Sequence, residues 1–341
     1  MGEHEDNLSS DDNLRTELEA LYDRNNDSNI LAQFDIDSKY YEIDEMKQIN
    51  CHTTSDGFKY NILHLNIQGL MSSLDNLKHF LNKLESNNIH IDFILLCETF
   101  LNDPSQQMHC GIAGYEFICR NRIKRKKGGV AIYISNKYQF KIKDEISTFV
   151  EGEYESIFIE VLANPHNLII GEIYRIPNTP AQLSLNRYED SLNKILVNKS
   201  HDIIIGTDQN FDYLKINDHK NTADLFNIFI SHGLIPVITR PTRITHNSAS
   251  LIDNIYIKLQ QTHLASGVIT TNLSDHLPIF AFYGKKTKTR PEQMTKTTRK
   301  CTETNIIEIR NKLERYDWAV LDNLTSNDAY NIFFARSYQY Y

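Results

Sequence analysis

Several residue types that define other classes of protein are scarce in this sequence. Its 341 residues include five cysteines, none of them in a C-x-x-C pair. An odd number without paired spacing is typical neither of a disulfide framework nor of a zinc site, so we expect a reducing compartment and no disulfide-linked partner. Glycine and proline number only 13 and 8, which argues against a fibrous or disordered chain.

Long apolar runs are also missing. The longest runs, such as Ile91 to Cys97, fall far short of the ~20 residues that a membrane-spanning helix needs. The N-terminus is acidic and has no apolar core, so the sequence shows no signal peptide. We therefore expect an intracellular protein with no membrane partner.

Basic charge is scarce only in one part of the chain. The net charge is −8, but residues 1–50 hold 14 acidic and 4 basic residues, which leaves 30 acidic and 32 basic residues beyond them. The overall acidity therefore does not exclude a nucleic-acid partner.

The composition predicts four regions along the chain. Residues 1–55 are polar and acidic, and we expect them to be a flexible segment. Residues 56–284 alternate short apolar runs with amphipathic stretches, as a folded domain does. Residues 285–303 are rich in Lys, Thr and Arg, which is typical of a solvated linker, and residues 304–341 hold a partial helical segment with Trp318.

The hydrophobic periodicity of the folded domain predicts many strands and few helices. The segment from Tyr60 to Ile67 alternates as a half-buried strand, and apolar residues at helical spacing over 74–84 then lead to a buried strand at 91–97. Such a content favours an α+β fold with two sheets packed face to face. Further strands are expected at 115–119, 129–135, 156–162, 168–174, 202–206, 251–257, 267–271 and 279–283, and helices at 185–196 and 223–232.

Polar residues stand where several of these strands end. Glu98 follows a buried strand, Asn66 ends another, and Asp208 and Asn210 follow a third with a spacing that points both side chains to one side. Hydrolysis of a phosphodiester needs a divalent cation, and Mg²⁺ prefers oxygen ligands of this kind. Each residue alone is equally a solvated cap or a turn former.

A histidine with nearby carboxylates forms another candidate group. His276 follows Asp275 in an S-D-H segment, and Asp253 ends the segment SLID upstream. A carboxylate that fixes one imidazole nitrogen lets the other deliver a proton or positive charge. An isolated S-D-H segment is often only a loop.

Six segments taken in order are more specific than any one of them. LNIQGL, LLCETF, GEIYRIP, GTDQN, SLIDNIYI and SDHLPI resemble, between Leu65 and Ile279, the motifs of the endonuclease/exonuclease/phosphatase superfamily. The resemblance implies a four-layered α/β/β/α sandwich, like that of deoxyribonuclease I, with the active site where the sheets meet at one edge. It also implies Mg²⁺, for which Mn²⁺ can substitute, held by Glu98 with Asn66 and Asp275 nearby.

The same resemblance implies a role for each remaining residue. Asp208 would position or deprotonate the attacking water, and Asn210 and Tyr174 would hold phosphate oxygens. His276, oriented by Asp253, would stabilise or protonate the transition state. The sequence departs from the family pattern at Thr207, which stands between Gly206 and Asp208, and at Gln68, where DNA-repair relatives often carry an acid.

Two further segments, GGVAIYI and RPTR, resemble the endonucleases of non-LTR retrotransposons. That resemblance implies an enzyme that nicks double-stranded DNA in the nucleus and leaves a 3′-hydroxyl for target-primed reverse transcription. It further implies element RNA as a partner, through a reverse transcriptase that this chain lacks.

Basic residues gather just before the Gly-Gly segment. Six of the eight residues from 120 to 127 are basic, which indicates either a solvated loop or an edge of a DNA groove that contacts phosphates. The candidate nucleic-acid-binding residues are Arg120, Arg122, Lys124, Arg125, Lys126, Lys127, Arg175 and Arg243.

Three other functions remain open at this point. A phosphatase or sphingomyelinase-like hydrolase of the same fold would act on a small or lipid phosphoester, although the Trp-x-Gly-Asp-x-Asn pattern of inositol phosphatases is absent. A poly(A)-directed exonuclease is another alternative. The third is a catalytically inactive, DNA-binding transposon remnant, against which the complete set of polar residues argues.

Overall fold

The computed structural model describes residues 36, 38–51, 60–163, 166–195, 201–245, 247–258, 262–285, 303–322 and 324–338. The chain forms two compact units, residues 1–287 and 288–341. Described elements of the smaller unit are helical, in the region where the sequence indicates a helical segment: α7 (Glu303–Glu314), η3 (Trp318–Leu321) and α8 (Ser326–Tyr338). The predicted linker lies outside the described residues over 286–302.

The larger unit contains two mixed β-sheets. The first sheet has the order β1 (Lys39–Tyr41), β15 (Thr262–Ile269), β16 (Ile279–Lys285), β2 (Tyr60–Asn66), β3 (Phe93–Cys97), β5 (Val130–Ser135) and β4 (Tyr115–Arg120). The second has the order β11 (Leu234–Pro236), β14 (Asp253–Lys258), β10 (Asp202–Asp208), β9 (Leu168–Arg175), β8 (Tyr154–Val161) and β6 (Phe140–Ile142), with β7 (Phe149–Val150) also paired to β8. A separate hairpin is formed by β12 (Arg243–Thr245) and β13 (Ser248–Ser250).

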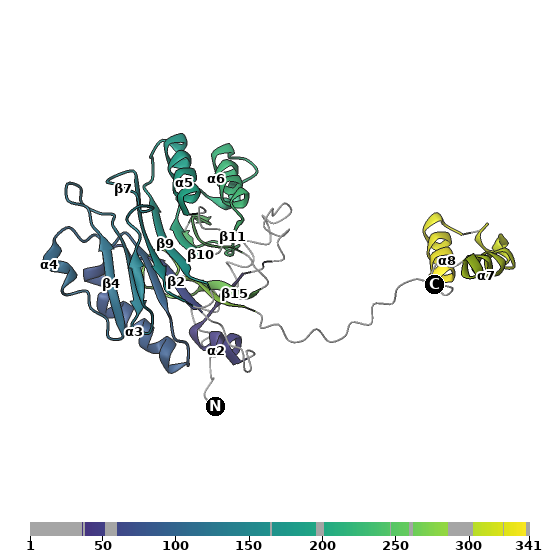
Figure 1. The fold of residues 1–341 in the computed structure, drawn as a ribbon, viewed down its shortest axis with the longest axis horizontal. Coiled ribbons are helices and arrows are strands. Elements are labelled where there is room, and N and C mark those ends of the chain that lie inside the picture. The colour runs from purple at the N-terminus through teal and green to yellow at the C-terminus, as the bar shows by residue number, and fades with distance from the viewer. Residues whose placement is uncertain are drawn as a thin grey trace, which may run out of the picture. The chain divides into compact units, whose positions relative to one another are not determined.

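Helices cover the outer faces of both sheets (Figure 1). Helix α3 (Leu70–Ser86) covers the first sheet, because its apolar residues recur at helical spacing and six of them are buried. Helices α5 (Ala181–Ile195) and α6 (Lys220–Ser231) cover the second sheet. The predicted four-layered α/β/β/α sandwich is therefore confirmed. Shorter helices are α2 (Ile43–Cys51), α4 (Pro104–Gln107) and η2 (Tyr213–Lys215).

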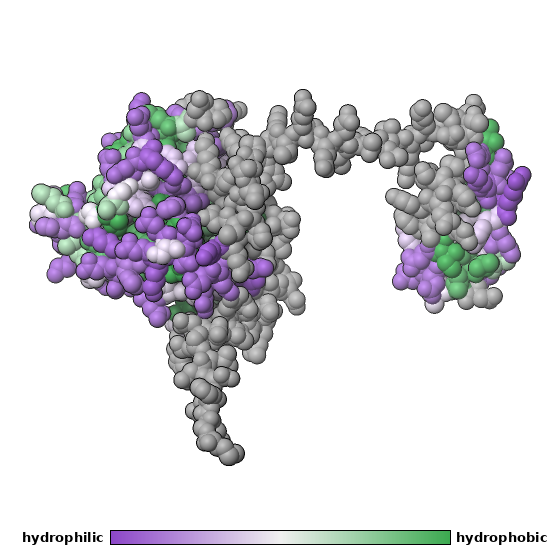
Figure 2. All heavy atoms as spheres, turned by 90° about the horizontal axis from the view of Figure 1, so that it is seen from below, coloured by the Kyte–Doolittle hydropathy of each residue, from purple (hydrophilic) through white to green (hydrophobic). Residues whose placement is uncertain are grey.

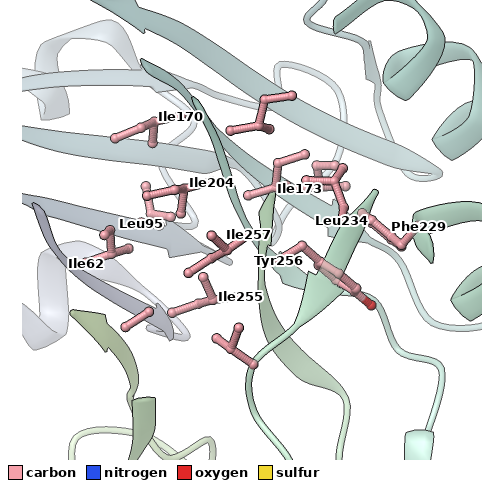
Figure 3. Close-up of a cluster of buried hydrophobic side chains, with 14 of the residues drawn as sticks. Ile62, Leu95, Ile170, Ile173, Ile204, Phe229, Leu234, Ile255, Tyr256 and Ile257 are labelled. Carbon is pink, nitrogen blue, oxygen red and sulfur yellow. The ribbon is translucent and has the colours of Figure 1, made fainter. Parts of the chain in front are cut away.

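The core between the sheets follows from the alternation of side chains along each strand. Ile62 of β2 and Leu95 of β3 point from the first sheet toward Ile204 and Ile255 of the second (Figure 3). The residues two positions further along β2, β9, β10 and β14 must share this inward face. Any polar residue at such a position is therefore held between the sheets.

The expectation of a flexible segment over residues 1–55 is wrong for residues 38–51. Strand β1 adds to the first sheet in parallel with β15, and Tyr40 and Met46 are fully buried. Ser38 also exchanges hydrogen bonds with Thr239, at 2.8 and 3.1 Å between backbone nitrogens and hydroxyl oxygens. A three-residue strand is stabilised by its partners and carries almost no periodicity of its own, which is why its sequence does not predict it.

Other short elements also escape prediction from the sequence, namely β6, β7, β11, β12, β13 and α4.

The face of the larger unit in Figure 2 is mostly hydrophilic over its described residues, with smaller apolar areas between them. No helix within the described ranges is long and apolar enough to cross a membrane.

Candidate active site

Polar residues at the ends of four inward-facing strands meet at one edge of the sandwich. Strand alternation places Asn66 on the face of Ile62, and Asp208 on the face of Ile204. Strand pairing then sets Asp208 between Tyr174 of β9 and Asp253 of β14, its registered neighbours. The sequence predicted each of these residues separately, and the structure brings them together.

The first group of contacts joins both sheets through Asn66. Its Nδ2 donates hydrogen bonds to Glu98 Oε1 at 3.0 Å and to Asp208 Oδ2 at 2.9 Å. The hydroxyl of Tyr174 donates to the same oxygen of Glu98 at 2.8 Å. Asp208 is buried and Glu98 is half-buried, so the carboxylate of Glu98 is the one that reaches solvent. Two carboxylates are thus held side by side by neutral donors.

The backbone at Glu98 adopts an unusual conformation. Its φ of 51° lies in the left-handed region, which costs about 1 kcal/mol or more for a residue with a side chain. Backbone contacts compensate for this cost, because Gly69 N donates to Glu98 O at 2.8 Å and Phe100 N donates to Gly128 O at 2.8 Å. The turn after β3 is therefore fixed by the loops that follow β2 and precede β5.

Electrostatics at this group indicate a site for a cation. Burial and the nearby charge of Asp253 raise the pKa of Asp208 to about 7. The oxygen-rich donor set of Glu98 and Asn66, beside Asp208, fits a hard divalent cation such as Mg²⁺, and a bound cation would offset the mutual repulsion of the two acids. The residues present therefore fit the predicted metal.

The second group of contacts is the buried pair of His276 and Asp253. His276 Nδ1 lies 2.8 Å from Asp253 Oδ2, and the hydroxyl of Thr242 donates to that same oxygen at 2.6 Å. Although burial lowers the pKa of His276, the charge of Asp253 raises it to about 9. The charge of the same histidine holds the pKa of Asp253 well below its usual range, against the effect of burial. His276 is therefore a protonated, oriented imidazolium at neutral pH.

Asn210 and Arg175 form a neighbouring contact. Asn210 Nδ2 donates to the carbonyl oxygen of Arg175 at 2.7 Å, and Arg175 in turn donates to the carbonyl oxygen of Asn210 at 3.3 Å. The guanidinium of Arg175 is buried, lies over the ring of Phe211 and donates to Ser184 Oγ at 3.0 Å. Arg175 therefore supports the Asn210 turn, and the prediction that it contacts nucleic acid is wrong.

Arg122 is a second candidate that the structure places inside the protein. Its guanidinium is buried against Glu155, and Glu155 also accepts a hydrogen bond from Gly129 N at 2.7 Å. This pair fixes the Gly-Gly segment through the contact with Gly129 N. The side chain of Arg122 is enclosed within the protein, so the prediction that it contacts DNA is wrong. A buried carboxylate needs a positively charged partner, which explains why Arg122 lies against Glu155.

The other basic candidates lie at the surface. Four are exposed, Lys124, Arg125, Lys126 and Lys127, in the loop of residues 121–129, which we call the basic loop. Arg120 pairs with Asp144. Arg243 donates two hydrogen bonds to Asp275 Oδ2, at 2.8 and 3.1 Å, so this carboxylate has a cationic partner within the protein.

Two residues of the site escaped prediction from the sequence, His64 and Glu172. Both are completely buried between the sheets, and His64 Nδ1 lies 3.0 Å from Glu172 Oε2. The available signal was an ionisable residue at an inward position of an otherwise apolar strand. Such a position requires a partner across the sheets, and the sequence alone does not identify it.

Comparison with known proteins agrees with this arrangement. Residues 60–276 match the Endonuclease/Exonuclease/phosphatase family, so the chain belongs to this family. Members of this family are hydrolytic phosphoesterases and nucleases. The matched region ends at His276 and contains the whole candidate site.

Solved structures with the same fold have low sequence identity to this chain. The AP endonuclease LMAP from Leishmania major is 13% identical, with a TM-score of 0.53, and the match covers 67% of this chain and 88% of that one. An endonuclease/exonuclease/phosphatase from Bacteroides vulgatus is 12% identical, with a TM-score of 0.50 and coverages of 67% and 99%. The endonuclease domain of TRAS1, a telomere-specific non-LTR retrotransposon, is 14% identical, with a TM-score of 0.49 and coverages of 67% and 99%. No curated protein sequence gave a match.

Proposed function

We propose that this protein is a Mg²⁺-dependent DNA endonuclease, which nicks duplex DNA by hydrolysis and leaves a 3′-hydroxyl. The observation that carries the choice of substrate is the position of the basic loop beside the acidic site. Thr99 N and Phe100 N, which directly follow Glu98, donate to the carbonyl oxygens of Gly129 and Gly128 at 3.3 and 2.8 Å. A polyanion whose phosphate reaches Glu98 therefore passes close to the basic loop.

The basic loop is held in a defined conformation. One carboxylate oxygen of Glu151 accepts hydrogen bonds from the backbone nitrogens of Lys124 and Arg125, at 2.8 and 3.0 Å. Their side chains remain exposed, so a phosphate can be contacted there without a cost for ordering the backbone. A small phosphoester would make no use of four cations arranged along a loop.

The residues of the site divide the chemistry between them. Asp208 is positioned to orient the attacking water and to accept its proton, since its raised pKa makes it a better base than an ordinary carboxylate. His276 presents positive charge to the phosphoryl group as negative charge develops on it. Mg²⁺ held by Glu98 and Asn66 would neutralise phosphate charge and stabilise the leaving 3′-oxygen.

Incubation of the protein with supercoiled plasmid and Mg²⁺ tests the proposal. We expect conversion to nicked circles by the wild type, none in EDTA, and none by Glu98→Gln. Extension of the nicks by a DNA polymerase without prior treatment would demonstrate the 3′-hydroxyl. The matched control is Asp92→Asn, which changes a buried carboxylate at the opposite end of the same strand.

A folded wild type that fails to nick DNA would contradict the proposal. Release of phosphate from small or lipid phosphoesters would then support the phosphatase alternative, and binding of duplex DNA without cleavage would support the inactive remnant. Since nicking of genomic DNA takes place in the nucleus, we propose a nuclear location for the active protein, with reverse transcription from the nick as the step that follows.

A further inference from the structure

Behind the pair of Asp253 and His276, two more ionisable side chains lie between the sheets. His64 of β2 and Glu172 of β9 are both 0% exposed. His64 Nδ1 lies 3.0 Å from Glu172 Oε2, and His64 Nε2 lies 3.5 Å from Asp253 Oδ1. Carboxyl groups and imidazole rings therefore alternate in one continuous row from the core to the site, in the order Glu172, His64, Asp253 and His276.

The stability of the folded protein does not explain why ionisable side chains occupy these buried positions. An isolated buried charge costs several kcal/mol, and replacing a buried ion pair by apolar residues of similar volume is often neutral or stabilising. The surrounding inward positions are apolar, for example Ile62 on the same strand as His64. The fold also reserves space for the pair, because a Cβ at Gly206 would lie 2.7 Å from Glu172 Oε2 and 3.0 Å from His64 Nδ1.

The contacts fix where the protons lie. The ring of His64 stands between two carboxyl groups, so a lone pair facing either carboxylate would be repelled. Three arrangements avoid repulsion: an imidazolium between two carboxylates, a neutral ring that accepts from a protonated Glu172, or a neutral ring that accepts from a protonated Asp253. The third is disfavoured because His276 and Thr242 already hold Asp253 as an acceptor. In the other two, His64 Nε2 carries its proton toward Asp253.

Asp253 needs this support because it lies in a closed environment. Its Oδ2 is held by Thr242 and His276, while its Oδ1 lies 3.1 Å from His276 Nδ1 and faces His64 on the other side. Without the proton of His64, one oxygen of a buried carboxylate would face the core. The carboxylate would then gain a proton or turn away, and its hydrogen bond to His276 would weaken.

We propose that His64 and Glu172 are positioning residues for hydrolysis, which hold Asp253 ionised and oriented so that it keeps His276 aligned at the site. Neither residue touches the substrate. The inference rests on the proposed function for its catalytic consequence, and on the contacts alone for its structural part.

An apolar replacement separates positioning from stability. In the variant His64→Leu with Glu172→Leu we expect a free energy of unfolding at least equal to that of the wild type, but a nicking kcat lower by roughly 10- to 100-fold with KM within about 2-fold. If the double leucine variant fails to fold, Glu172→Gln takes its place and should lower kcat in the same direction. The control Asp92→Asn should keep the wild-type kcat.

The same change in a His276→Ala background tests the route of the effect. Because His64 and Glu172 act through His276, we expect the leucine pair to lower kcat there by less than about 3-fold. An equal loss in both backgrounds would overturn the proposal, as would full activity of a stable double leucine variant.

A spectroscopic readout does not depend on activity. We expect ¹⁵N NMR of labelled imidazoles to show the Nδ1–H signal of His276 shifted in the double leucine variant and unshifted in Asp92→Asn. If the wild type nicks no DNA, the proposed function fails, while a shift of this signal still supports the contact and its absence overturns it. His64, Cys97 and Glu172 also approach within 4.8 Å of one another, so a stoichiometric metal lost on His64→Gln would overturn the proposal in favour of a metal site.

Discussion

The two ends of strand β3 carry two acids with opposite surroundings. Asp92 precedes the strand, accepts a hydrogen bond from Asn61 N at 2.8 Å and pairs with the ammonium group of Lys137. Glu98 follows the strand in a left-handed conformation and shares the donor Asn66 Nδ2 with Asp208. Among the described residues, no Lys or Arg forms an ion pair with it. A cation within the protein partly offsets the burial of the first acid, which raises its pKa. The second stands among other acids, which leaves room for a cation from solution.

This difference separates a structural carboxylate from a functional one on the same strand. Burial alone does not distinguish them, because Asp92 is more buried than Glu98. The identity of the neighbouring charges does, since like charges gathered near a strand end are costly unless a ligand or a metal compensates them. Four predictions test the comparison, from the largest expected effect to the smallest.

The largest effect is expected from Glu98→Gln. The change replaces an anionic ligand of the cation by a neutral amide oxygen, so nicking of supercoiled plasmid in Mg²⁺ should fall by about 1000-fold or more. Calorimetric titration with Mg²⁺ should show weaker binding as well. Wild-type nicking by this variant would mean that Glu98 is only a structural cap.

The next effect concerns His276 and alkaline pH. Its pKa in the folded protein is raised above the ordinary 6.5 to about 9, so its contribution to stability is present below pH 6.5 and is lost as the pH rises through 9. The free energy of unfolding of the metal-free wild type, relative to His276→Gln, should fall by roughly 3 kcal/mol over that interval. Urea unfolding at several pH values measures it, and a constant difference would contradict the pairing with Asp253.

A smaller effect is expected from neutralising the basic loop. Changing Lys124, Arg125, Lys126 and Lys127 to Gln should weaken duplex binding by roughly 10- to 100-fold at moderate salt and reduce the slope of log K against log salt by about 3 to 4. Fluorescence anisotropy with labelled duplex measures both. Changing Lys312 and Arg310 of the smaller unit provides a charge control, and an equal loss there would contradict a specific role for the loop.

The smallest effect is expected at the other end of β3. Asp92→Asn should change the free energy of unfolding by less than about 1 kcal/mol, since the lost pairing with Lys137 is offset by relief of the burial that raises the pKa of Asp92, and an acceptor for Asn61 N remains. Plasmid nicking should stay within about 2-fold of the wild type. A larger loss of activity would remove the distinction between the two acids.

Much of the fold could be predicted because the long strands and helices carry their own periodicity. Helix α3 and the longer strands follow directly from apolar spacing, namely β2, β3, β4, β5, β8, β9, β10, β14, β15 and β16. The short elements could not be predicted in this way. Strand β1 exists because β15 offers an open edge, and three residues contain too little pattern to indicate that pairing.

The candidate site shows the same division. Asn66, Glu98, Asp208, Asp253 and His276 could be named because each follows or ends a recognisable strand or motif, and the segments appear in a familiar order. The basic residues around position 122 were all assigned to one surface, although Arg122 is buried against Glu155. Sequence alone cannot tell an exposed arginine from one that compensates a buried acid, because the acid lies elsewhere in the chain.

The sequence by itself therefore determined the class of fold, the family and the residues with catalytic potential, since these depend on local periodicity and on the identity of side chains. Only the tertiary structure decided which of those residues share a charge environment. The two sheets must be packed before His64 meets Glu172, before Asn66 bridges two carboxylates, and before Asp92 and Glu98 acquire opposite surroundings. The strength of an electrostatic interaction depends on the distance between two charges in the folded protein, and the number of residues between them in the sequence does not give that distance.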